Sequence, residues 1–357
     1  MVVLHFASIS NNRSSGVDVV VPRHVAEQAK FADTALYNVK NGTIEGFDIQ
    51  SKRVAPFSLD LLPAPYNCPD IVIFHEIFRP QYLLISKELK KKRIPYIVFP
   101  HGCLTSGALR EKYLKKKIAM ALVFNRFIKN SVAIQCLSTY EFNNTLFNCP
   151  KFIGTNGFDI AQENTQNGDK VKSFVYIGRI DISHKGIDLL INAIEIAKKE
   201  LEKHNIMVHL YGPSEKSVEK KILRIIKKKQ LEELLYLHNA VYGCEKLEVL
   251  HRSSFFVQTS RYEGMPMGIL EAMSESVPVI VTEGTSLSHL VDLYGAGYSA
   301  ENNANSIAEA LVKASGCIDE REMGASAKRL IAENFAWEKV SRNNVNEYKR
   351  IIQQSKE

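Results

Sequence analysis

The sequence predicts an α/β protein made of two domains, each built on a doubly wound parallel sheet. Short apolar runs bounded by turn residues alternate with stretches of helical periodicity, which is the pattern of strand–helix–strand units. The pattern starts afresh at residue 173, after a polar stretch at 161–172 that is predicted to be a linker. The 357 residues are enough for two domains of ordinary size.

Composition and charge limit the class of protein. Apolar residues make up 45% and charged residues 24% of the chain, as in globular proteins. The formal net charge of +7 favours anionic partners without choosing among nucleotides, membranes and nucleic acid. The six cysteines form no C-x-x-C pair, so we expect free thiols in a reducing cytoplasm. The N-terminal MVVLHFASIS lacks a basic leader, and no apolar run approaches the roughly 20 residues that span a bilayer.

The first half of the chain is predicted to begin with a strand at Val2–Ser8. A polar turn, Ser10–Gly16, and an apolar segment, Val17–Val21, follow it. Further strands are predicted at Thr34–Val39, Ile71–His75, Tyr96–Phe99 and Val132–Leu137. His75 and His101 come at strand ends, where open α/β sheets bind ligands, although a lone histidine there is more often structural. Ser138 begins a helix with a capping box, STYE.

Two basic segments stand out in this half, Lys87–Arg93 and Ala108–Asn130. The second has apolar residues at helical spacing among seven cations, with Lys112–Lys117 at its centre. A basic amphipathic helix is typical of binding to a membrane surface, at about 1 kcal/mol per basic residue near an anionic leaflet. A helix with a solvated charged side is the commoner alternative, and the sequence leaves both open.

The second half is predicted to open with a phosphate site. A strand at Ser173–Ile180 contains Gly178 and Arg179 near its end, and Lys185 with Gly186 precedes a helix at Ile187–Leu201. Helix N-termini attract anions, arginine can bind two phosphate oxygens in a fork, and lysine supplies a point charge. Arg179 and Lys185 are therefore predicted phosphate ligands.

The remaining elements of this half continue the alternation. Strands are predicted at Met207–Tyr211, within Leu235–Gly243, at Ser253–Thr259 and at Val277–Val281, and helices at Glu215–Leu231, Ile307–Ala314, Met323–Asn334 and Asn343–Gln354. Gly295–Ala300 fits G-x-G-x-x-A, but it lies late in the chain and is predicted to be a turn. Trp337 is expected to pack and not to bind a ligand.

A glycine-rich turn is predicted between the strand Ser253–Thr259 and a helix that starts at Gly268. Glycine permits positive φ and close approach of backbone to a ligand, and Pro266 suits the first turn of a helix. The turn thus directs N–H groups and the positive end of the helix dipole at a phosphate. Glu263 and Glu271 flank it, which suggests hydroxyl binding beside a phosphate, as in a sugar nucleotide.

The text E-x-G-x-P-x-G-x-x-E-A-M followed by P-V-I-x-T resembles the signature of glycosyltransferase family 4, a group of retaining enzymes with the GT-B fold. The text G-R-x(5)-K-G-x-D-x-L-I resembles the diphosphate-binding segment of that family. Ser276 departs from it, because glycine is usual there. The resemblance implies two Rossmann-like domains facing across a cleft. Residues 1–160 would bind the acceptor, 173–339 would bind the donor, and a helix at about 340–357 would pack back onto the first domain.

The resemblance also implies roles for single residues. Arg179 and Lys185 would neutralise the diphosphate, Glu271 would bind the ribose, and Glu263 with His101 would contact the donor sugar. The catalytic residues implied are Glu263, His101, Arg179 and Lys185, and the further donor-binding positions are Gly16, Gly264, Met265, Pro266, Met267 and Glu271. The chain has no D-x-D sequence, so we expect neither a metal ion nor a cofactor.

The expected function is retaining transfer of a sugar from a nucleotide-diphosphate sugar to a saccharide hydroxyl. The expected acceptor is a lipid-linked oligosaccharide of bacterial-type cell-surface polysaccharide biosynthesis, on the inner face of the cytoplasmic membrane, and a soluble sugar is the alternative. No nucleic-acid partner is expected. A nucleotide-sugar epimerase stays open on fold alone. The misplaced G-x-G-x-x-A disfavours a nicotinamide-dependent oxidoreductase, and the two phosphate-site cations disfavour a non-catalytic carbohydrate-binding protein.

Overall fold

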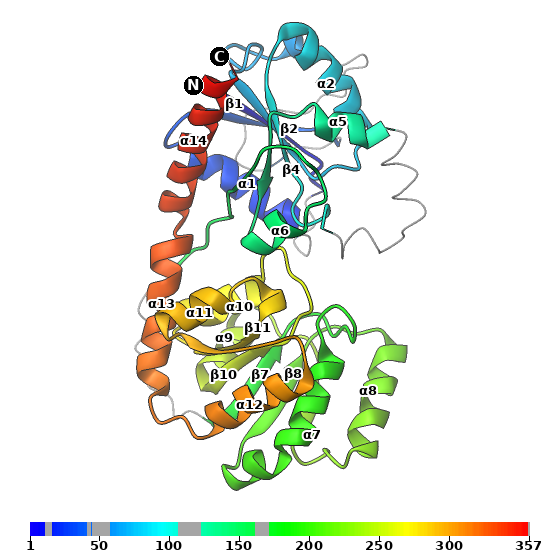
Figure 1. Ribbon diagram of the computed structural model, residues 1–357, viewed down its shortest axis with the longest axis vertical. Coiled ribbons are helices and arrows are strands. Elements are labelled where there is room, and N and C mark those ends of the chain that lie inside the picture. Colours follow the sequence, from blue (N-terminus) through cyan, green and yellow to red (C-terminus); the bar gives the residue numbers. More distant parts are fainter. Residues whose placement is uncertain (11–15, 41–43, 45–57, 106–122, 161–170, 356–357) are drawn as a thin grey trace. The chain divides into compact units, whose positions relative to one another are not determined.

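The computed structural model describes residues 1–10, 16–40, 44, 58–105, 123–160 and 171–355. The chain divides into two compact units. Unit 1 comprises Met1–Gly157 with Trp337–Glu357, and unit 2 comprises Phe158–Ala336. Each unit contains a six-stranded parallel sheet flanked by helices (Figure 1). The predicted α/β class with two doubly wound parallel sheets is confirmed.

The sheet of unit 1 has the strand order β2-β1-β3-β4-β5-β6. Its strands are β1 (Val2–Ala7), β2 (Asp33–Asn38), β3 (Ile71–His75), β4 (Tyr96–Phe99), β5 (Ala133–Cys136) and β6 (Lys151–Ile153). The helices are α1 (Gly16–Gln28), α2 (Pro80–Lys92), α5 (Asn125–Lys129), α6 (Thr139–Asn144) and α14 (Trp337–Gln354), with a 3₁₀ turn at Leu59–Leu61. The order reverses between β1 and β3, and such a reversal marks the crevice where open sheets bind ligands.

Alternate residues of β1 face opposite sides of this sheet, as the two-residue period of a strand requires. Leu4 and Phe6 belong to an apolar core that also contains Tyr82 of α2. His5 points to the opposite side, where its Nε2 atom lies 3.1 Å from Oε1 of Gln28 at the end of α1. The face covered by α2 is therefore apolar, whereas the other face carries buried polar groups.

The sheet of unit 2 has the order β12-β11-β10-β7-β8-β9. Its strands are β7 (Val171–Ile177), β8 (Met207–Tyr211), β9 (Leu235–His238), β10 (Ser253–Gln258), β11 (Val279–Thr282) and β12 (Gly297–Ala300). The helices are α7 (Ile187–Lys203), α8 (Lys216–Lys228), α9 (Gly243–Arg252), α10 (Met267–Ser274), α11 (Ser288–Tyr294), α12 (Ala304–Ser315) and α13 (Glu320–Phe335), with a 3₁₀ turn at Glu283–Thr285. Here the reversal falls between β7 and β10, so the loops after these strands flank the crevice.

Two apolar layers hold the sheet of unit 2. Phe174 and Tyr176 of β7 pack in the layer that contains α7, α8 and α12. Val175 and Ile177 face the other layer, with α10 and α13. Because every residue of β7 from Phe174 to Ile177 is buried, the strand reads as a continuous apolar run, which is typical of a parallel sheet covered on both faces.

The last helix, α14, belongs to unit 1. The hydroxyl of Tyr348 donates a 2.7 Å hydrogen bond to Oε1 of Gln135 on β5. Trp337, at the start of the helix, is buried, and a Cβ atom at Gly157 would lie 2.3 Å from its ring. Trp337 thus packs within the protein, as the sequence predicted.

Three boundaries differ from the sequence prediction. The turn predicted at Gly295–Ala300 is wrong, because Gly297–Ala300 forms the edge strand β12, with Gly297 opposite Val279. Only Gly295, at φ 62°, has the turn conformation, and it ends α11. Residues 171 and 172, assigned to the linker, belong to β7. The last helix starts at Trp337 and not near residue 340, and an acidic residue, Glu338, lies in its first turn.

Several predictions fall on residues that the structure does not describe. The basic segment Lys112–Lys117 is among them, as are residues 161–170 of the linker and residues 11–15 of the first turn. The described end of the predicted helix Ala108–Asn130 contains α5. Within the described ranges, no helix is long and apolar enough to cross a bilayer. None of the six cysteines forms a disulfide.

Candidate functional site

The loops after β7 and β10 meet at the strand-order reversal of unit 2. The Thr259 hydroxyl donates to the Gly186 carbonyl at 3.0 Å, and the Arg261 backbone N–H donates to the His184 carbonyl at 3.0 Å. Gly186 has φ 65°, and a Cβ atom there would lie 2.0 Å from the Thr259 carbonyl oxygen. Only glycine allows this approach, so the sequence Lys185-Gly186 fixes how the two loops touch.

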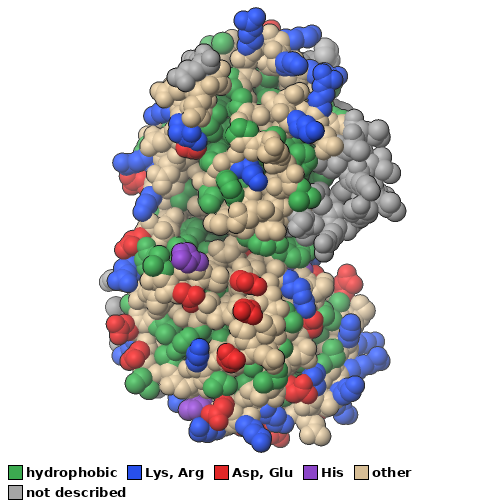
Figure 2. Space-filling model, in the orientation of Figure 1, with side chains coloured by type: hydrophobic (Ala, Val, Ile, Leu, Met, Phe, Trp, Pro, Cys, Tyr) green, Lys and Arg blue, Asp and Glu red, His purple; other side chains and the backbone are tan. Residues whose placement is uncertain are grey.

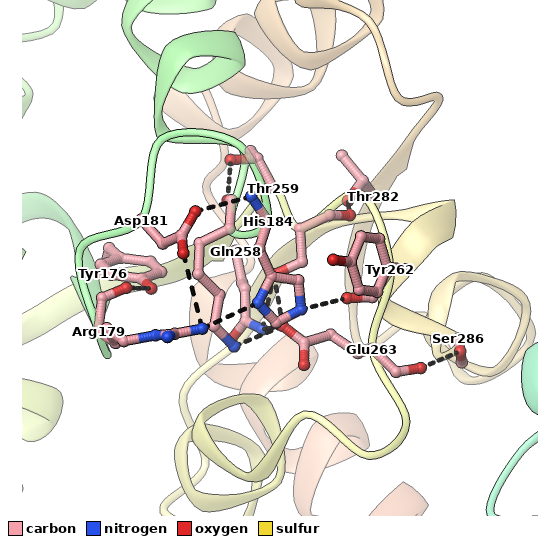
Figure 3. A network of polar contacts seen from close by, with 12 residues as sticks. Tyr176, Arg179, Asp181, His184, Gln258, Thr259, Tyr262, Glu263, Thr282 and Ser286 are labelled. Carbon is pink, nitrogen blue, oxygen red and sulfur yellow. Dashed lines mark hydrogen bonds and ion pairs between the residues drawn. The ribbon is translucent and has the colours of Figure 1, made fainter. Parts of the chain in front are cut away.

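Lys185 and Glu263 form a nearly buried ion pair between these loops. Figure 3 shows Glu263 with the other labelled polar side chains of the site. Oε1 of Glu263 accepts hydrogen bonds from Lys185 Nζ at 2.5 Å, Ser260 Oγ at 2.6 Å and Gln258 Nε2 at 3.1 Å. The Glu263 side chain is only 8% exposed. No donor among the described residues bonds its Oε2 atom, so this oxygen is available to accept a hydrogen bond from a ligand.

Arg179 is the exposed cation of the site, with 62% of its side chain accessible. Its Nη2 atom lies 3.3 Å from Nδ1 of His184 and 3.6 Å from Oδ2 of Asp181. His184 Nε2 lies 2.9 Å from the Tyr262 carbonyl, which only accepts, so Nε2 carries the proton and Nδ1 accepts from the guanidinium. Burial opposes ionisation of Asp181, but hydrogen bonds from the His184 and Ser183 backbone and the nearby Arg179 lower its pKa.

The guanidinium of Arg261, by contrast, is occupied by hydrogen bonds within the protein. It donates two hydrogen bonds to the carboxylate of Asp188, at 2.8 and 2.7 Å, and a third to the Ser183 carbonyl at 2.7 Å. The pair ties the loop after β10 to the first turn of α7. Arg179 is therefore the arginine whose guanidinium can turn to an incoming anion.

Glu271 on α10 pairs with Lys246 on α9. Both line a hollow of about 610 Å³ together with Tyr242, Glu275 and Phe158. A separate hollow of similar volume is lined by Arg179, Asp181, Ser183, Pro213 and Lys221. The structure thus places the two predicted ligands, Arg179 and Glu271, on different hollows of unit 2.

The predicted glycine-rich turn leads into α10. Helix α10 begins at Met267, and Pro266 is its N-cap, one position before the first helical turn where it was predicted. No side chain caps this helix. The N–H groups of Met267 and Ile269 donate to the Met265 and Pro266 carbonyls, which leaves the Gly268 N–H suited to an anion. Gly268 lets the helix approach β7, because a Cβ atom there would lie 3.3 Å from the Ile177 carbonyl. Gly264 and Met265 connect Glu263 to this turn.

The other two predicted site residues lie in unit 1. Gly16 is the first residue of α1. His101 follows β4 with φ 52°, a backbone conformation that costs free energy in a non-glycine residue. Its Nε2 atom lies 2.9 Å from Nδ1 of His75, so His75 takes part in the surroundings of His101.

Sequence reasoning missed the polar partners of the site. Gln258, Ser260 and His184 all bond to predicted ligands or to the loops that carry them. A signal for the first two existed, because the strand text SSFFVQTS ends in polar residues that a buried strand accepts only when they are hydrogen-bonded. Lys246 gave no signal, since a lysine in a helix is usually solvated.

Fold and site together define a class: an α/β protein of two Rossmann-like units, with cations and carboxylates paired beyond the carboxyl ends of β7 and β10 in the second sheet. Residues 158–329 match the family model described as "Glycosyl transferases group 1". This range covers most of unit 2.

Two curated relatives from Staphylococcus aureus are similar to parts of the chain. One is a poly(ribitol-phosphate) alpha-N-acetylglucosaminyltransferase, 31% identical over 160 residues, which are 44% of this chain and 31% of the relative. The other is the capsular polysaccharide biosynthesis glycosyltransferase CapH, 32% identical over 125 residues, which are 35% of this chain and 34% of the relative. The chain therefore matches about a third of the length of each.

Solved structures resemble the chain more fully. Anabaena Alr3699/HepE in complex with UDP gives a TM-score of 0.73 at 13% identity, over 98% of this chain and all of the other. S. aureus TarM, in a complex with fondaparinux, alpha-GlcNAc-glycerol and UDP, gives 0.58 at 22% identity, over 79% of this chain and 55% of the other. At such identities the likeness shows the fold alone, which is that of the GT-B glycosyltransferases.

Proposed function

We propose that this protein is a glycosyltransferase that moves a sugar from a nucleotide-diphosphate sugar to a saccharide hydroxyl. The observation that carries the proposal is the Lys185–Glu263 pair at the strand-order reversal of unit 2, with Arg179 exposed beside it. A cation and a hydroxyl-binding carboxylate on adjoining loops suit a sugar phosphate. The family model over residues 158–329 supports the same reading.

The proposed chemistry breaks the bond between the anomeric carbon and the diphosphate oxygen and forms a bond between that carbon and the acceptor hydroxyl oxygen. The hydroxyl proton leaves with the departing diphosphate. Negative charge develops on that oxygen, and Arg179 with Lys185 stabilises it in the way that preorganised cations stabilise a leaving group. The uncapped N-terminus of α10 adds the Gly268 N–H as a donor. We further propose that these groups act without a divalent ion.

The carboxylates bind hydroxyls in this mechanism. Glu263 Oε2 accepts a hydroxyl of the transferred sugar, while Lys185, Ser260 and Gln258 hold Oε1 in place. Glu271 accepts hydrogen bonds from the ribose hydroxyls, and its ion pair with Lys246 holds the carboxylate in place. We propose retention of the anomeric configuration, by analogy with the family that the sequence resembles.

The acceptor is proposed to be a lipid-linked saccharide at the cytoplasmic face of a membrane. Lys87, Lys90, Arg93 and Arg126 surround a hollow of about 640 Å³ in unit 1. Its described walls include Ile94, Val123 and Phe127, and no acidic side chain is among these described residues. Figure 2 shows Lys and Arg side chains gathered over the end of unit 1 where α2 lies. Cations around apolar walls suit an anionic amphiphile. One curated relative is named for poly(ribitol-phosphate) and the other for capsular polysaccharide biosynthesis, and both names agree with a polymeric acceptor.

The transfer proposal is tested by following the donor and its products by NMR, with and without saccharide acceptors and with EDTA. Transfer predicts that nucleoside diphosphate is released only with an acceptor and that the anomeric configuration is retained. An epimerase would change the donor sugar without any acceptor. A donor that is altered without release of diphosphate would contradict the proposal.

The membrane proposal is tested separately, by co-sedimentation with anionic liposomes. A variant with Lys87, Lys90 and Arg93 changed to alanine should lose most binding. The matched control changes Lys216, Lys220 and Lys227 of α8, which are also exposed, and should bind as the unchanged protein does. If both variants lost liposome binding to the same extent, the binding would be non-specific electrostatic attraction, and this would contradict the membrane proposal.

A further inference from the structure

A continuous chain of buried polar side chains runs through unit 1 from β6 to His101. It starts at the Gly154 carbonyl, which accepts a 2.8 Å hydrogen bond from Nε2 of Gln135. The Gln135 amide is thereby oriented, so its Oε1 accepts the 2.7 Å hydrogen bond of the Tyr348 hydroxyl. The Tyr348 oxygen in turn accepts from Nε2 of Gln28 at 3.3 Å, which leaves Gln28 Oε1 as an acceptor.

Three histidines continue this chain in one direction. Gln28 Oε1 can only accept, so Nε2 of His5, 3.1 Å away, carries a proton and its Nδ1 does not. Nδ1 of His5 then accepts from Nε2 of His75 at 2.9 Å. Nδ1 of His75 accepts from Nε2 of His101, also at 2.9 Å. Each of the three histidines is therefore protonated on Nε2 and unprotonated on Nδ1. Nδ1 of His101, at the end of the chain, is unprotonated for the same reason.

The surroundings keep these rings neutral. His5 and His75 are fully buried, and burial, together with neighbouring histidines, holds the pKa of each well below its usual range. Burial likewise lowers the pKa of His101 to about 3. His24, which accepts from Gln28 through Nε2 at 2.6 Å, lies beside the chain, and burial lowers its pKa to about 4.

We infer that Gln28, His5 and His75 are positioning residues that fix His101 in the Nε2–H tautomer, so that its Nδ1 offers a lone pair beyond the carboxyl end of β4. No partner for this Nδ1 is present in the described part of the chain. A lone pair at this position accepts a hydrogen bond from an O–H group and disfavours the approach of a carboxylate, which has no proton to donate. Its use on a sugar hydroxyl rests on the proposed function, but the tautomer does not.

The tautomer can be measured directly in the free protein. The full chain is labelled with ¹⁵N-histidine, and long-range ¹H–¹⁵N correlations are recorded at pH 7.5 without ligand. The His101 signals are identified by their loss in His101→Asn. We expect a protonated Nε2 and an unprotonated Nδ1. A protonated Nδ1 at His101 in the unchanged protein would overturn the inference.

Substitutions test the positioning role. Gln28→Leu removes the acceptor that orients His5, so a second set of His101 signals with protonated Nδ1 should appear. Gln28→Met removes the same acceptor with a side chain closer in shape to glutamine, so it tests the point even if Gln28→Leu does not fold. The control is Tyr82→Phe, which removes hydrogen bonds to the His75 and Phe6 carbonyls and leaves the ring nitrogens untouched.

Each outcome decides the point. Released tautomers in the first two variants, with an unchanged pattern in Tyr82→Phe, support the inference. An unchanged His101 pattern in a folded Gln28→Leu or Gln28→Met protein overturns it, and so does release in Tyr82→Phe. Because no substrate is present, failure of the proposed transfer reaction would leave these results unaffected.

Discussion

Lys185 Nζ lies 2.5 Å from Oε1 of Glu263, although the two residues are 78 positions apart. The pair joins the loop after β7 to the loop after β10, which are neighbours only because the strand order reverses between them. Both side chains are largely buried, with 18% and 8% exposed. The contact is therefore part of the fold of unit 2 as well as of its candidate site.

Removing the lysine from this pair should destabilise the protein. Lys185→Ala leaves the Glu263 carboxylate buried without its cation, so the free energy of unfolding should fall by about 3 kcal/mol. Urea denaturation measures this. The control, Lys203→Ala, breaks an exposed pair with Glu200 and should cost less than about 1 kcal/mol. Equal losses in the two variants would show that the pair adds nothing beyond a surface contact.

Gly186 and Gly243 offer a matched test of backbone approach. Both have positive φ, 65° and 53°, but only Gly186 faces another backbone, while nothing lies within 4 Å of a Cβ atom at Gly243. Gly243→Ala should lower the free energy of unfolding by about 1 kcal/mol, the penalty of the left-handed conformation. Gly186→Ala should lower it by about 3 kcal/mol or more, because the loops must also separate. Similar values would mean that the approach to Thr259 is not required.

Replacing Ser276 with glycine should stabilise the folded protein. It follows α10 with φ 60°, where glycine is favoured over residues with a Cβ atom. Ser276→Gly should raise the free energy of unfolding by about 0.5–1 kcal/mol. Ser274→Gly, inside α10, should lower it by at least about 0.5 kcal/mol. If Ser276→Gly lowered the free energy of unfolding, the Ser276 side chain would make a stabilising contact that outweighs the strain of its positive φ.

The sequence predicted most strands and helices of the described chain, because buried parallel strands read as apolar runs and the helices keep their period. It failed at Gly297–Ala300, since a short edge strand containing glycine has little apolar signal. The family resemblance singled out Ser276 as a position where glycine is usual, and the structure shows positive φ there.

The polar partners in the candidate sites could not be predicted in the same way. Lys185 and Glu263 were each singled out, but their direct pairing depends on the order of β7 and β10 in the sheet. His5 looked like any residue of a strand, and its contact with His75 depends on the pairing of β1 with β3. Long-range register is not visible in local periodicity.

Glu141 should make stability depend on pH. Burial raises its pKa to about 7, although backbone N–H groups of Leu137 and Gly102 bond its oxygens. Its pKa in the unfolded chain is lower, so the folded state binds the extra proton, and stability should fall as pH rises from about 4.5 to 7, by up to about 1.4 kcal/mol per unit. The difference between the unchanged protein and Glu141→Gln should show this slope. A difference that is constant from pH 5 to 8 would contradict it.

The buried histidines act with the opposite sign. The pKa values of His24 and His101 are lowered, so the unfolded chain binds more protons below about pH 6.5, and stability should fall as the solution becomes more acidic. Comparison with Glu141→Gln cancels this common contribution, which is why the pH series uses a difference between two proteins.

The measurement that tests the central claim most directly is ligand-induced thermal stabilisation by UDP, GDP, ADP, dTDP and their sugar conjugates, without metal. A ligand at 100 times its dissociation constant should add about 2.7 kcal/mol to the free energy of unfolding. We predict that one nucleotide stabilises the unchanged protein and Arg224→Ala, an exposed arginine of α8. Arg179→Ala should fold equally well but bind roughly 10 to 100 times more weakly, since it loses charge-assisted hydrogen bonds. No stabilisation by any of these ligands, with or without magnesium, or equal affinity in Arg179→Ala, would contradict the donor site.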